Sequence, residues 1–394
     1  MNKHHQGRLR RLRAATAICS TMTALLMPGA AHALQDCVLG GVAVNPDNGS
    51  STEGKSGLMR CVDRDSGLLM REQELRDGKH LGLERFYQNG KLVKEHRVNE
   101  RGNKQGQARE FAPSGQVLRD DNYDNGNLVA LARQYFDNGR LRRVAFYARP
   151  QGEQAYAEFN PSGQLRELHC AGAPRLAPDV DDAQLCGFNS VSELDFFSDQ
   201  GLLRARLRMD KGKAVRQETL YASGVPQRVT QLQGAQRIEQ NFSPAGVKLR
   251  EERFAVGEHG SLLELEQRYA ETGKLIQEKR WQAGEPTSDR SYYMNGQLRQ
   301  ETLYSTEQGA RLKQLSQYHD NGKLASVGRS RSLSLYRDVP VGAHKIFDEQ
   351  GQLRSESSHD EKGHLNRERS WDAQGTLERD DEVFDDGSRK SYAK

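Results

Sequence analysis

Glycine recurs along this chain at nearly constant intervals, and this periodicity constrains the fold more than any other feature. From Gly78 to Gly139 the successive intervals are 12, 12, 13, 11 and 13 residues, and from Gly351 to Gly387 every interval is 12. Many of these glycines follow an aromatic residue by three or four positions and precede a leucine by two, as in Phe136-Asp-Asn-Gly139-Arg-Leu141. A short unit repeated in this way is typical of a repeat architecture.

The residues beside each glycine identify the unit as a strand followed by a turn. Asn-Gly or Asp-Gly pairs stand at 77–78, 89–90, 125–126, 138–139, 295–296, 321–322 and 386–387. Both residues of such a pair tolerate the positive φ that a type I′ hairpin turn requires. Other units read like Asn160-Pro-Ser-Gly163, in which an acceptor, a proline and a final glycine suit a longer hairpin turn.

The sequence therefore predicts an all-β chain, an elongated antiparallel β-meander. Its units of about 12 residues leave about 7–9 for each strand, and two units make a hairpin repeat of about 23–24 residues. Hydrophobic residues are only 35% of the chain, and Arg, Glu, Gln and Lys fill much of each strand, so the strands cannot cover two buried faces. We expect a single-layer twisted sheet or a half-open roll with one face in water.

Three segments break the repeat. Residues 34–66 are rich in glycine and serine, residues 169–194 contain prolines, and residues 325–345 include a run of serine and arginine before Pro340. Loops on a regular scaffold often carry binding, so these segments are candidates for a partner-contact surface, with tolerated insertions as the alternative. The predicted order is a signal peptide (1–33), an N-terminal segment (34–66), hairpin repeats (67–168), an insertion (169–194), degenerate then regular repeats (195–324), an irregular insertion (325–345) and C-terminal repeats (346–394).

The first 33 residues have the pattern of a cleavable secretory signal. Five Lys and Arg precede a short apolar run that ends in Ala31-His-Ala33, which predicts cleavage after Ala33 and a periplasmic or extracellular protein. The run is too short to span a bilayer as a helix. Because this segment holds five of the 58 basic residues and no acid, the rest is close to neutral and lacks the basic surplus typical of nucleic-acid-binding proteins.

Four cysteines follow the predicted signal: Cys37, Cys61, Cys170 and Cys186. An even number in an oxidising compartment predicts two disulfides, and pairing of sequence neighbours is favoured because each pair brackets one irregular segment. Free or metal-bound thiols are the alternative, although the C-x-x-C spacing of a zinc site is absent from the sequence. The charged Asp36 directly before Cys37 argues against lipid attachment there.

The motifs that suggest chemistry have simpler explanations. Gly49-Ser-Ser-Thr-Glu-Gly-Lys-Ser56 matches the P-loop pattern, but Gly57 follows at once and the sequence after it has no helical periodicity. His359 and His364 with their acidic neighbours are the densest group of potential metal ligands, yet they flank a turn of the repeat. The sequence thus predicts a protein that is not an enzyme, with no catalytic residue, cofactor or metal site.

The units at 75–165 and 263–390 alternate motifs such as Asp77-Gly-Lys-His-Leu-Gly82 and Glu84-Arg-Phe-Tyr-Gln-Asn-Gly-Lys-Leu92. In this they resemble the MORN-variant repeat family of bacterial proteins, often labelled antitoxin-like, although the fit is poor at 169–260. The resemblance implies a non-enzymatic, protein-binding role, in which some exported members act as immunity proteins against secreted toxins. Related eukaryotic repeats are associated with membrane surfaces.

The function that these observations predict is an exported, non-catalytic protein-binding repeat protein. Its most concrete version is an antitoxin-like immunity protein that neutralises a toxin delivered to the cell envelope, so the expected partner is another protein such as a secreted toxin or effector. The alternative is an envelope scaffold that binds lipid headgroups or cell-wall glycan. An enzyme with a site built from the irregular segments is less favoured.

Overall fold

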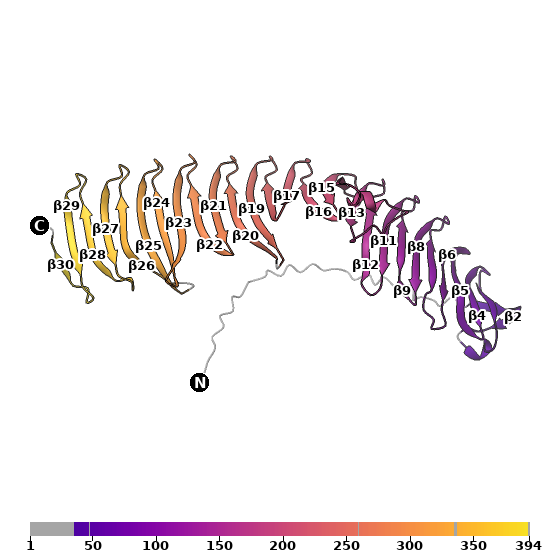
Figure 1. Cartoon of the computed structure of the whole chain (residues 1–394). Helices are drawn as coiled ribbons and strands as arrows, with labels where there is room; N and C mark the ends of the chain where they lie inside the picture. Colours follow the sequence, from indigo (N-terminus) through magenta and orange to yellow (C-terminus); the bar gives the residue numbers. More distant parts are fainter. Residues whose placement is uncertain (1–34, 47, 259, 335–336, 393–394) are drawn as a thin grey trace, which may run out of the picture.

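The computed structural model describes residues 35–46, 48–258, 260–334 and 337–392. These residues form two antiparallel meander sheets of 13 and 17 strands, which follow one another along a curved single-layer ribbon (Figure 1). Almost every strand pairs with its neighbours in sequence, and neither sheet closes on itself. The all-β prediction and its single-layer version are therefore confirmed. In the described part of the chain, every helix is too short or too polar to cross a membrane.

The strands have the following bounds. The N-terminal sheet contains β1 (Gln35–Leu39), β2 (Val42–Val44), β3 (Gly57–Asp63), β4 (Leu69–Arg76), β5 (Lys79–Gln88), β6 (Lys91–Val98), β7 (Gly106–Phe111), β8 (Val117–Asp124), β9 (Asn127–Leu128), β10 (Ala130–Tyr135), β11 (Leu141–Ala148), β12 (Gly152–Phe159) and β13 (Leu165–His169). The first part of the C-terminal sheet contains β14 (Ser192–Phe197), β15 (Leu203–Asp210), β16 (Lys213–Leu220), β17 (Pro226–Gln233), β18 (Gln236–Phe242), β19 (Lys248–Gly257), β20 (Gly260–Tyr269), β21 (Leu275–Gln282) and β22 (Glu285–Tyr292). It continues with β23 (Leu298–Glu307), β24 (Ala310–Tyr318), β25 (Leu324–Ser334), β26 (Arg337–Phe347), β27 (Leu353–His359), β28 (Leu365–Trp371), β29 (Leu377–Val383) and β30 (Arg389–Ser391). Two short helices, η1 (Gly49–Ser51) and α1 (Asp182–Leu185), complete the described elements.

The glycines close two kinds of hairpin. In two-residue type I′ turns both residues have positive φ, as at Asn89-Gly90 and at the less expected Lys211-Gly212 and Ala283-Gly284. In the three-residue turns only the glycine has positive φ, and two backbone hydrogen bonds close the loop: Phe136 N donates to Arg140 O (2.9 Å) and Gly139 N to Phe136 O (2.8 Å). A bulge accompanies this turn, which is the usual form of a three-residue hairpin.

The type I′ prediction is wrong at four of the Asn-Gly and Asp-Gly pairs. Asn138, Asn295, Asn321 and Asp386 all lie in three-residue turns and lack positive φ. For two of the asparagines, the next turn along the ribbon provides a reason. Asn295 Nδ2 donates to Asp320 O and Asn321 Nδ2 to Glu349 O, both at 2.8 Å, so each asparagine joins neighbouring hairpins instead of occupying the left-handed region.

A row of alternating charges stabilises one face of the N-terminal sheet. Opposite positions on successive strands carry Arg60, Glu72, Arg85, Glu95, Arg109, Asp120 and Arg133. Ion-pair distances along the row run from 3.0 Å for Arg60 Nε–Glu72 Oε1 to 3.9 Å for Arg109 Nε–Asp120 Oδ1. Opposite charges that face one another across strands contribute about 0.2–1 kcal/mol per pair. Charge pairing thus replaces part of the apolar core that the composition cannot supply.

The C-terminal sheet carries a similar row in which amides join the charges. Its first part runs through Asp195, Arg206, Glu218, Val229, Gln240, Glu251, Gln267, Glu278, Arg290 and Glu301. Glu251 is 3% exposed and accepts hydrogen bonds from Lys248 Nζ (2.8 Å), Gln240 Nε2 (2.9 Å) and Arg253 Nε (2.9 Å). Both oxygens of the buried Glu251 carboxylate therefore have partners, as burial of a charge requires.

The segment 169–194 marks the break between the two sheets. Within it, Leu176 and Val180 pack on Val144, Ala155 and Ala157 of the N-terminal sheet. The same segment reaches the C-terminal sheet, because the turn at 211–212 donates backbone hydrogen bonds of 2.9 and 2.8 Å to the carbonyl oxygens of residues 187 and 186. The insertion therefore clamps the ends of both sheets where the ribbon bends (Figure 1).

The disulfides join Cys37 to Cys61 and Cys170 to Cys186, as the sequence predicts. Residues 325–345, by contrast, are not an irregular insertion: their described part belongs to the long β25–β26 hairpin. Serine and arginine are compatible with a strand here because a single-layer sheet leaves much of each face polar. On β26, Val339 and Val341 supply the apolar contact by packing against Leu312.

Reduction of the disulfides should loosen the two bracketed segments more than the repeats. The Cys170–Cys186 bridge, with a sequence separation of 16, is worth about 3 kcal/mol by the chain-entropy relation, and the central hairpins of the C-terminal sheet contain no cysteine. Hydrogen exchange with and without reductant should show lower protection in 37–61 and 170–186, and unchanged protection in β19–β24. Equal loss throughout both sheets would contradict this expectation.

Candidate functional site

The three segments predicted as contact surfaces lie far apart along the ribbon. Residues 34–66 contribute β1–β3 at one end, residues 169–194 occupy the bend, and residues 325–345 lie in a hairpin of the other sheet (Figure 1). The structure does not bring them together. A binding site must therefore be sought within single stretches of the ribbon.

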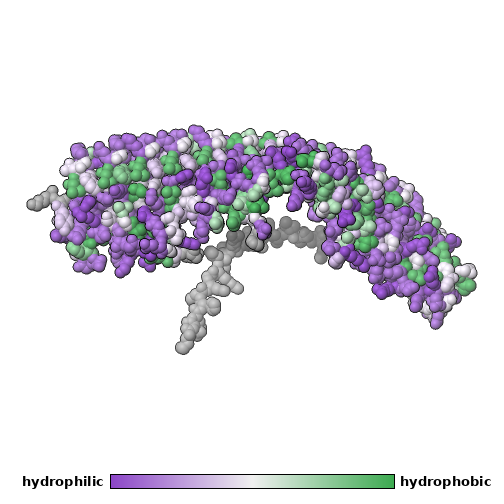
Figure 2. Space-filling model, in the orientation of Figure 1, coloured by the Kyte–Doolittle hydropathy of each residue, from purple (hydrophilic) through white to green (hydrophobic). Residues whose placement is uncertain are grey.

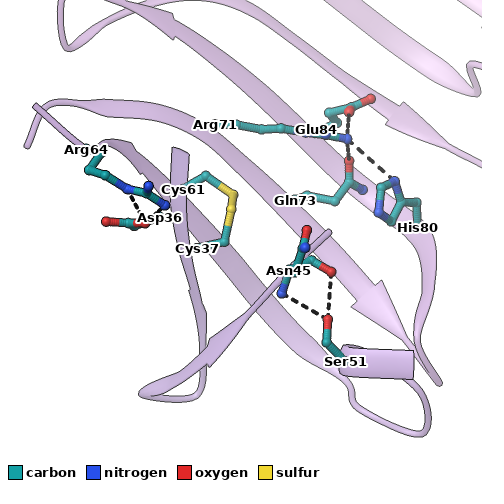
Figure 3. Close-up of a disulfide and its surroundings, with 10 residues drawn as sticks. All are labelled: Asp36, Cys37, Asn45, Ser51, Cys61, Arg64, Arg71, Gln73, His80 and Glu84. Atoms are coloured by element: carbon teal, nitrogen blue, oxygen red, sulfur yellow. Dashed lines mark hydrogen bonds and ion pairs between the residues drawn. A yellow bond between two sulfur atoms is a disulfide. The ribbon is translucent and has the colours of Figure 1, made fainter. Parts of the chain in front are cut away.

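The surroundings of the first disulfide are structural. Cys37 and Cys61 occupy directly opposite positions on β1 and β3, and Arg64 pairs with Asp36 at 2.8 Å beside them (Figure 3). Further along the same region, Arg71 lies between the side chains of Gln73 and Glu84 (Figure 3). The side chains drawn there are thus joined to one another by hydrogen bonds and ion pairs within the chain.

The P-loop pattern does not form a phosphate cradle. Lys55 Nζ donates to Ser51 O at 2.7 Å, and the loop leads into strand β3 rather than into a helix. A P-loop needs a following helix N-terminus and a free lysine. The reading of this segment as a loop is consistent with its geometry.

The two histidines of the sequence cluster have different partners in the structure. His359 packs edge-to-face against His344 with ring centroids 5.0 Å apart, whereas His364 pairs with Asp360 at 3.3 Å. Burial and the neighbouring His344 lower the pKa of His359. Among the residues that the structure describes, groups of three or more metal-ligating side chains in suitable positions are absent.

A large hollow lies across the hairpin ends of β21–β25, and we call it the hairpin-end groove. Its volume is about 1220 Å³. Tyr304, Pro286 and Leu333 give it apolar walls, and the side chain of Leu333 is 50% exposed. Arg311, Lys313 and Arg331 give it cations. Each of them has an acidic partner: Glu285 at 3.3 Å, Asp338 at 2.6 Å and Glu361 at 3.4 Å, respectively. Tyrosine and arginine, both present here, are among the residues enriched in protein-binding hot spots.

A smaller hollow of about 370 Å³ lies on the N-terminal sheet, and we call it the Ala108 hollow. It is on the face opposite to the row of alternating charges. The small side chain of Ala108 stands directly across from Asp121 in the β7–β8 pair, and larger side chains surround the gap that it leaves. The walls include Phe86, Lys94, His96, Lys104, Glu110, Arg119, Asp121 and Tyr123.

Asp121 is the unusual group of this hollow. It is 2% exposed, and its Oδ2 accepts hydrogen bonds from Arg119 Nε (2.5 Å) and Tyr123 Oη (3.2 Å). Its Oδ1 is buried without a hydrogen-bond partner, which costs about 1–3 kcal/mol for a polar group. Burial raises the pKa of Asp121 despite the neighbouring Arg119. Burial and the missing partner of Oδ1 both disfavour the ionised form of Asp121, and perturbed groups of this kind cluster at functional sites.

Neighbouring acids in the same sheet show the opposite behaviour. Burial alone would raise the pKa of Glu84, but hydrogen bonds and charge from His96 and Arg71 lower it. Sequence reasoning did not find the Ala108 hollow, because Asp121 reads as a turn residue and Ala108 as an ordinary strand position. The one available signal, an alanine among large polar residues, acquires meaning only once the register is known.

Comparisons with known proteins add little to this geometry. The chain matches no protein-family model, and no curated protein matches it either. Among solved structures it is similar to TarM, with 16% identity over 24% of this chain and 18% of that chain, at a TM-score of 0.18. It is also similar to the Photorhabdus luminescens Tc holotoxin pore, with 12% identity over 86% of this chain and 24% of that chain, again at 0.18. The chain thus spans under a quarter of either structure, and TM-scores this low carry no argument about function.

Proposed function

We propose that the chain is an exported, non-catalytic protein-binding repeat protein, most concretely an antitoxin-like immunity protein that neutralises a toxin delivered to the cell envelope. Its expected partner is therefore another protein. The resemblance of its repeats to MORN-variant proteins supports the more concrete version. The hairpin-end groove is the single observation that carries the general proposal, that the chain binds another protein.

The extended shape supports a binding role. The accessible surface of the chain is 26323 Å², whereas a compact monomer of 44.3 kDa exposes about 15,500 Å². Residues outside the described part account for at most about 6,500 Å² of this surface, even if fully extended. Apolar residues also form a broken band on the visible face, flanked by hydrophilic ones (Figure 2). A ribbon of this kind offers far more than the roughly 800 Å² that one side of a stable interface needs.

The cysteines and the N-terminal segment bear on the compartment in which the protein works. The two disulfides indicate an oxidising compartment outside the cytoplasm. Export by a signal peptide cleaved after Ala33, to the periplasm or beyond, is the finer proposal, and that segment lies outside the described residues. Sequencing the N-terminus of the secreted protein tests it directly.

The groove is tested by a paired substitution. Tyr304→Ala with Leu333→Asp should weaken binding of the partner toxin at least about tenfold, because it removes an aromatic anchor and places a charge on an apolar wall. The measurement is calorimetric titration, together with protection of cells that co-express a toxin encoded beside the gene. Leu377→Asp is the matched control, since Leu377 is 39% exposed on the same sheet and outside the groove. Full protection by the double variant would remove the groove from the proposal.

A further inference from the structure

We propose that the Ala108 hollow is a saccharide-binding site, in which the buried carboxylate of Asp121 accepts a hydrogen bond from a sugar hydroxyl. This site goes beyond the proposed function, and it stands whether or not a protein partner binds at the hairpin-end groove. The argument begins with the shape of the hollow and proceeds to its charges.

The backbone register makes the hollow a permanent feature of the sheet. Strands β6 and β7 pair at Lys94–Glu110 and at the adjacent Glu95–Arg109, and the next pairing is the isolated bridge Val98–Lys104. The irregular stretch between these pairings carries His96 on one side and Ala108 on the other. On the next strand, β8, Asp121 lies directly opposite Ala108. A methyl group between two polar side chains leaves a gap that neither of them fills.

The unpartnered Oδ1 defines what the ligand must offer. Both hydrogen bonds that Asp121 receives within the chain end on Oδ2, so Oδ1 requires an additional donor from outside. A hydroxyl or amide N–H supplies one without charge, and an ammonium group supplies one with charge. The neighbouring side chains decide between them.

The charges of the walls disfavour a cationic donor. Lys94, Lys104 and Arg119 all line the hollow, and Lys104 Nζ stands 4.9 Å from the centre of the Tyr123 ring. Lys94 pairs with Glu110 at 3.1 Å. Arg109 and the carboxylates of Glu95, Glu110 and Asp121 line the hollow as well, and these acids pair with Lys94, Arg109 and Arg119. The wall cations outnumber the carboxylates by one, and Lys104 stands over Tyr123 rather than beside an acid. A ligand ammonium would therefore meet the like charge of Lys104, whereas a hydroxyl oxygen, or a carboxylate on the ligand, would accept from it. We therefore expect acidic sugars to bind better than neutral ones, and neutral ones better than amino sugars.

Size and apolar content point to a sugar ring. The volume of about 370 Å³ is near the lower end of the range for small-ligand sites, about 300–1,000 Å³, which suits a mono- or disaccharide. Phe86 and Tyr123 add aromatic surface to the walls, beside carboxylate, guanidinium and ammonium groups. A sugar ring carries several hydroxyls that both donate and accept hydrogen bonds, so it can satisfy such a mixture of groups.

The test uses three monosaccharides with the same ring and the full-length mature protein. Glucuronate, glucose and glucosamine are titrated separately, with binding followed by calorimetry and by ligand-observed NMR. The expected order of affinity is glucuronate, then glucose, then glucosamine. Equal affinity for all three, a preference for glucosamine, or no saturable binding of any sugar would overturn the proposal. Saturable binding of an N-acetylated dipeptide without binding of any sugar would overturn it as well, since the hollow would then accept peptide.

Two variants locate the binding. Ala108→Leu fills the hollow and should weaken glucuronate binding at least about tenfold, and Asp121→Asn, which removes the carboxylate, should do the same. Ala343→Leu is the matched control, because it adds the same side chain to an exposed strand position outside the hollow. Thermal unfolding of each variant shows whether the sheet is intact. Undiminished binding by folded Ala108→Leu would overturn the assignment, as would a more stable Asp121→Asn that binds sugar like the unmodified protein.

Discussion

Replacing Leu176 with alanine should lower the stability of the end of the N-terminal sheet by about 2–5 kcal/mol. The side chain of Leu176 is 0% exposed, and it is the part of the insertion that packs most deeply on Val144, Ala155 and Ala157. A ribbon with few apolar clusters has little to compensate for such a cavity. The loss is expected to be larger than for any aliphatic residue on an exposed strand face.

The damage should remain local, because each strand contacts mainly its sequence neighbours, as in other repeat proteins. Hydrogen exchange should show lost protection in β11–β13, extending to the turn at 211–212 that is hydrogen-bonded to the insertion, and normal protection in β19–β29. Leu377→Ala is the control, since that side chain is 39% exposed. A uniform loss of protection across both sheets would mean that the ribbon unfolds as one unit and that the clamp has no separate role.

The repeat could be predicted from sequence because its turns are encoded locally. Gly246 and Gly375, for example, have φ of 82° and 85°, a region that glycine adopts without steric cost, and each closes a hairpin. The disulfide pairing was predictable for the same reason, since each bridge joins cysteines close in sequence. Neither inference depends on contacts between distant residues.

The remaining features depend on register and could not be predicted in this way. Asn138-Gly139 and Asn89-Gly90 are identical dipeptides, yet only the second forms a type I′ turn, because the neighbouring hairpin engages the first. Ala108 and Asp121 are 13 positions apart, and only pairing of their strands creates the hollow. The break into two sheets likewise follows from where Leu176 packs, which composition does not reveal.

The charged rows make the stability of the ribbon sensitive to acid, most clearly at Glu251. Burial alone would raise the pKa of Glu251, but hydrogen bonds from Lys248, Gln240 and Arg253 lower it from 4.5 to about 2. The same balance lowers the pKa of Glu72 and Glu278. A carboxylate whose folded pKa is depressed adds stability that is complete above its unfolded pKa and disappears as the pH falls through the folded value. The pKa of Asp121 is raised instead, so the contribution of this group to the free energy of unfolding increases as the pH falls.

The free energy of unfolding of the C-terminal sheet should therefore fall steeply between pH 4.5 and about 2, and Glu251 alone should account for roughly 3 kcal/mol of the decrease. Urea unfolding at a series of pH values measures this dependence. Glu251→Gln should be less stable than the unmodified chain at pH 7, and the difference should shrink towards pH 2 because protonation removes the same charge. Glu271→Gln, in an exposed turn of the same sheet, should follow the unmodified curve. Parallel curves for Glu251→Gln and the unmodified chain would show that the buried carboxylate is not the source of the acid sensitivity, and that the charged rows follow the fold without stabilising it.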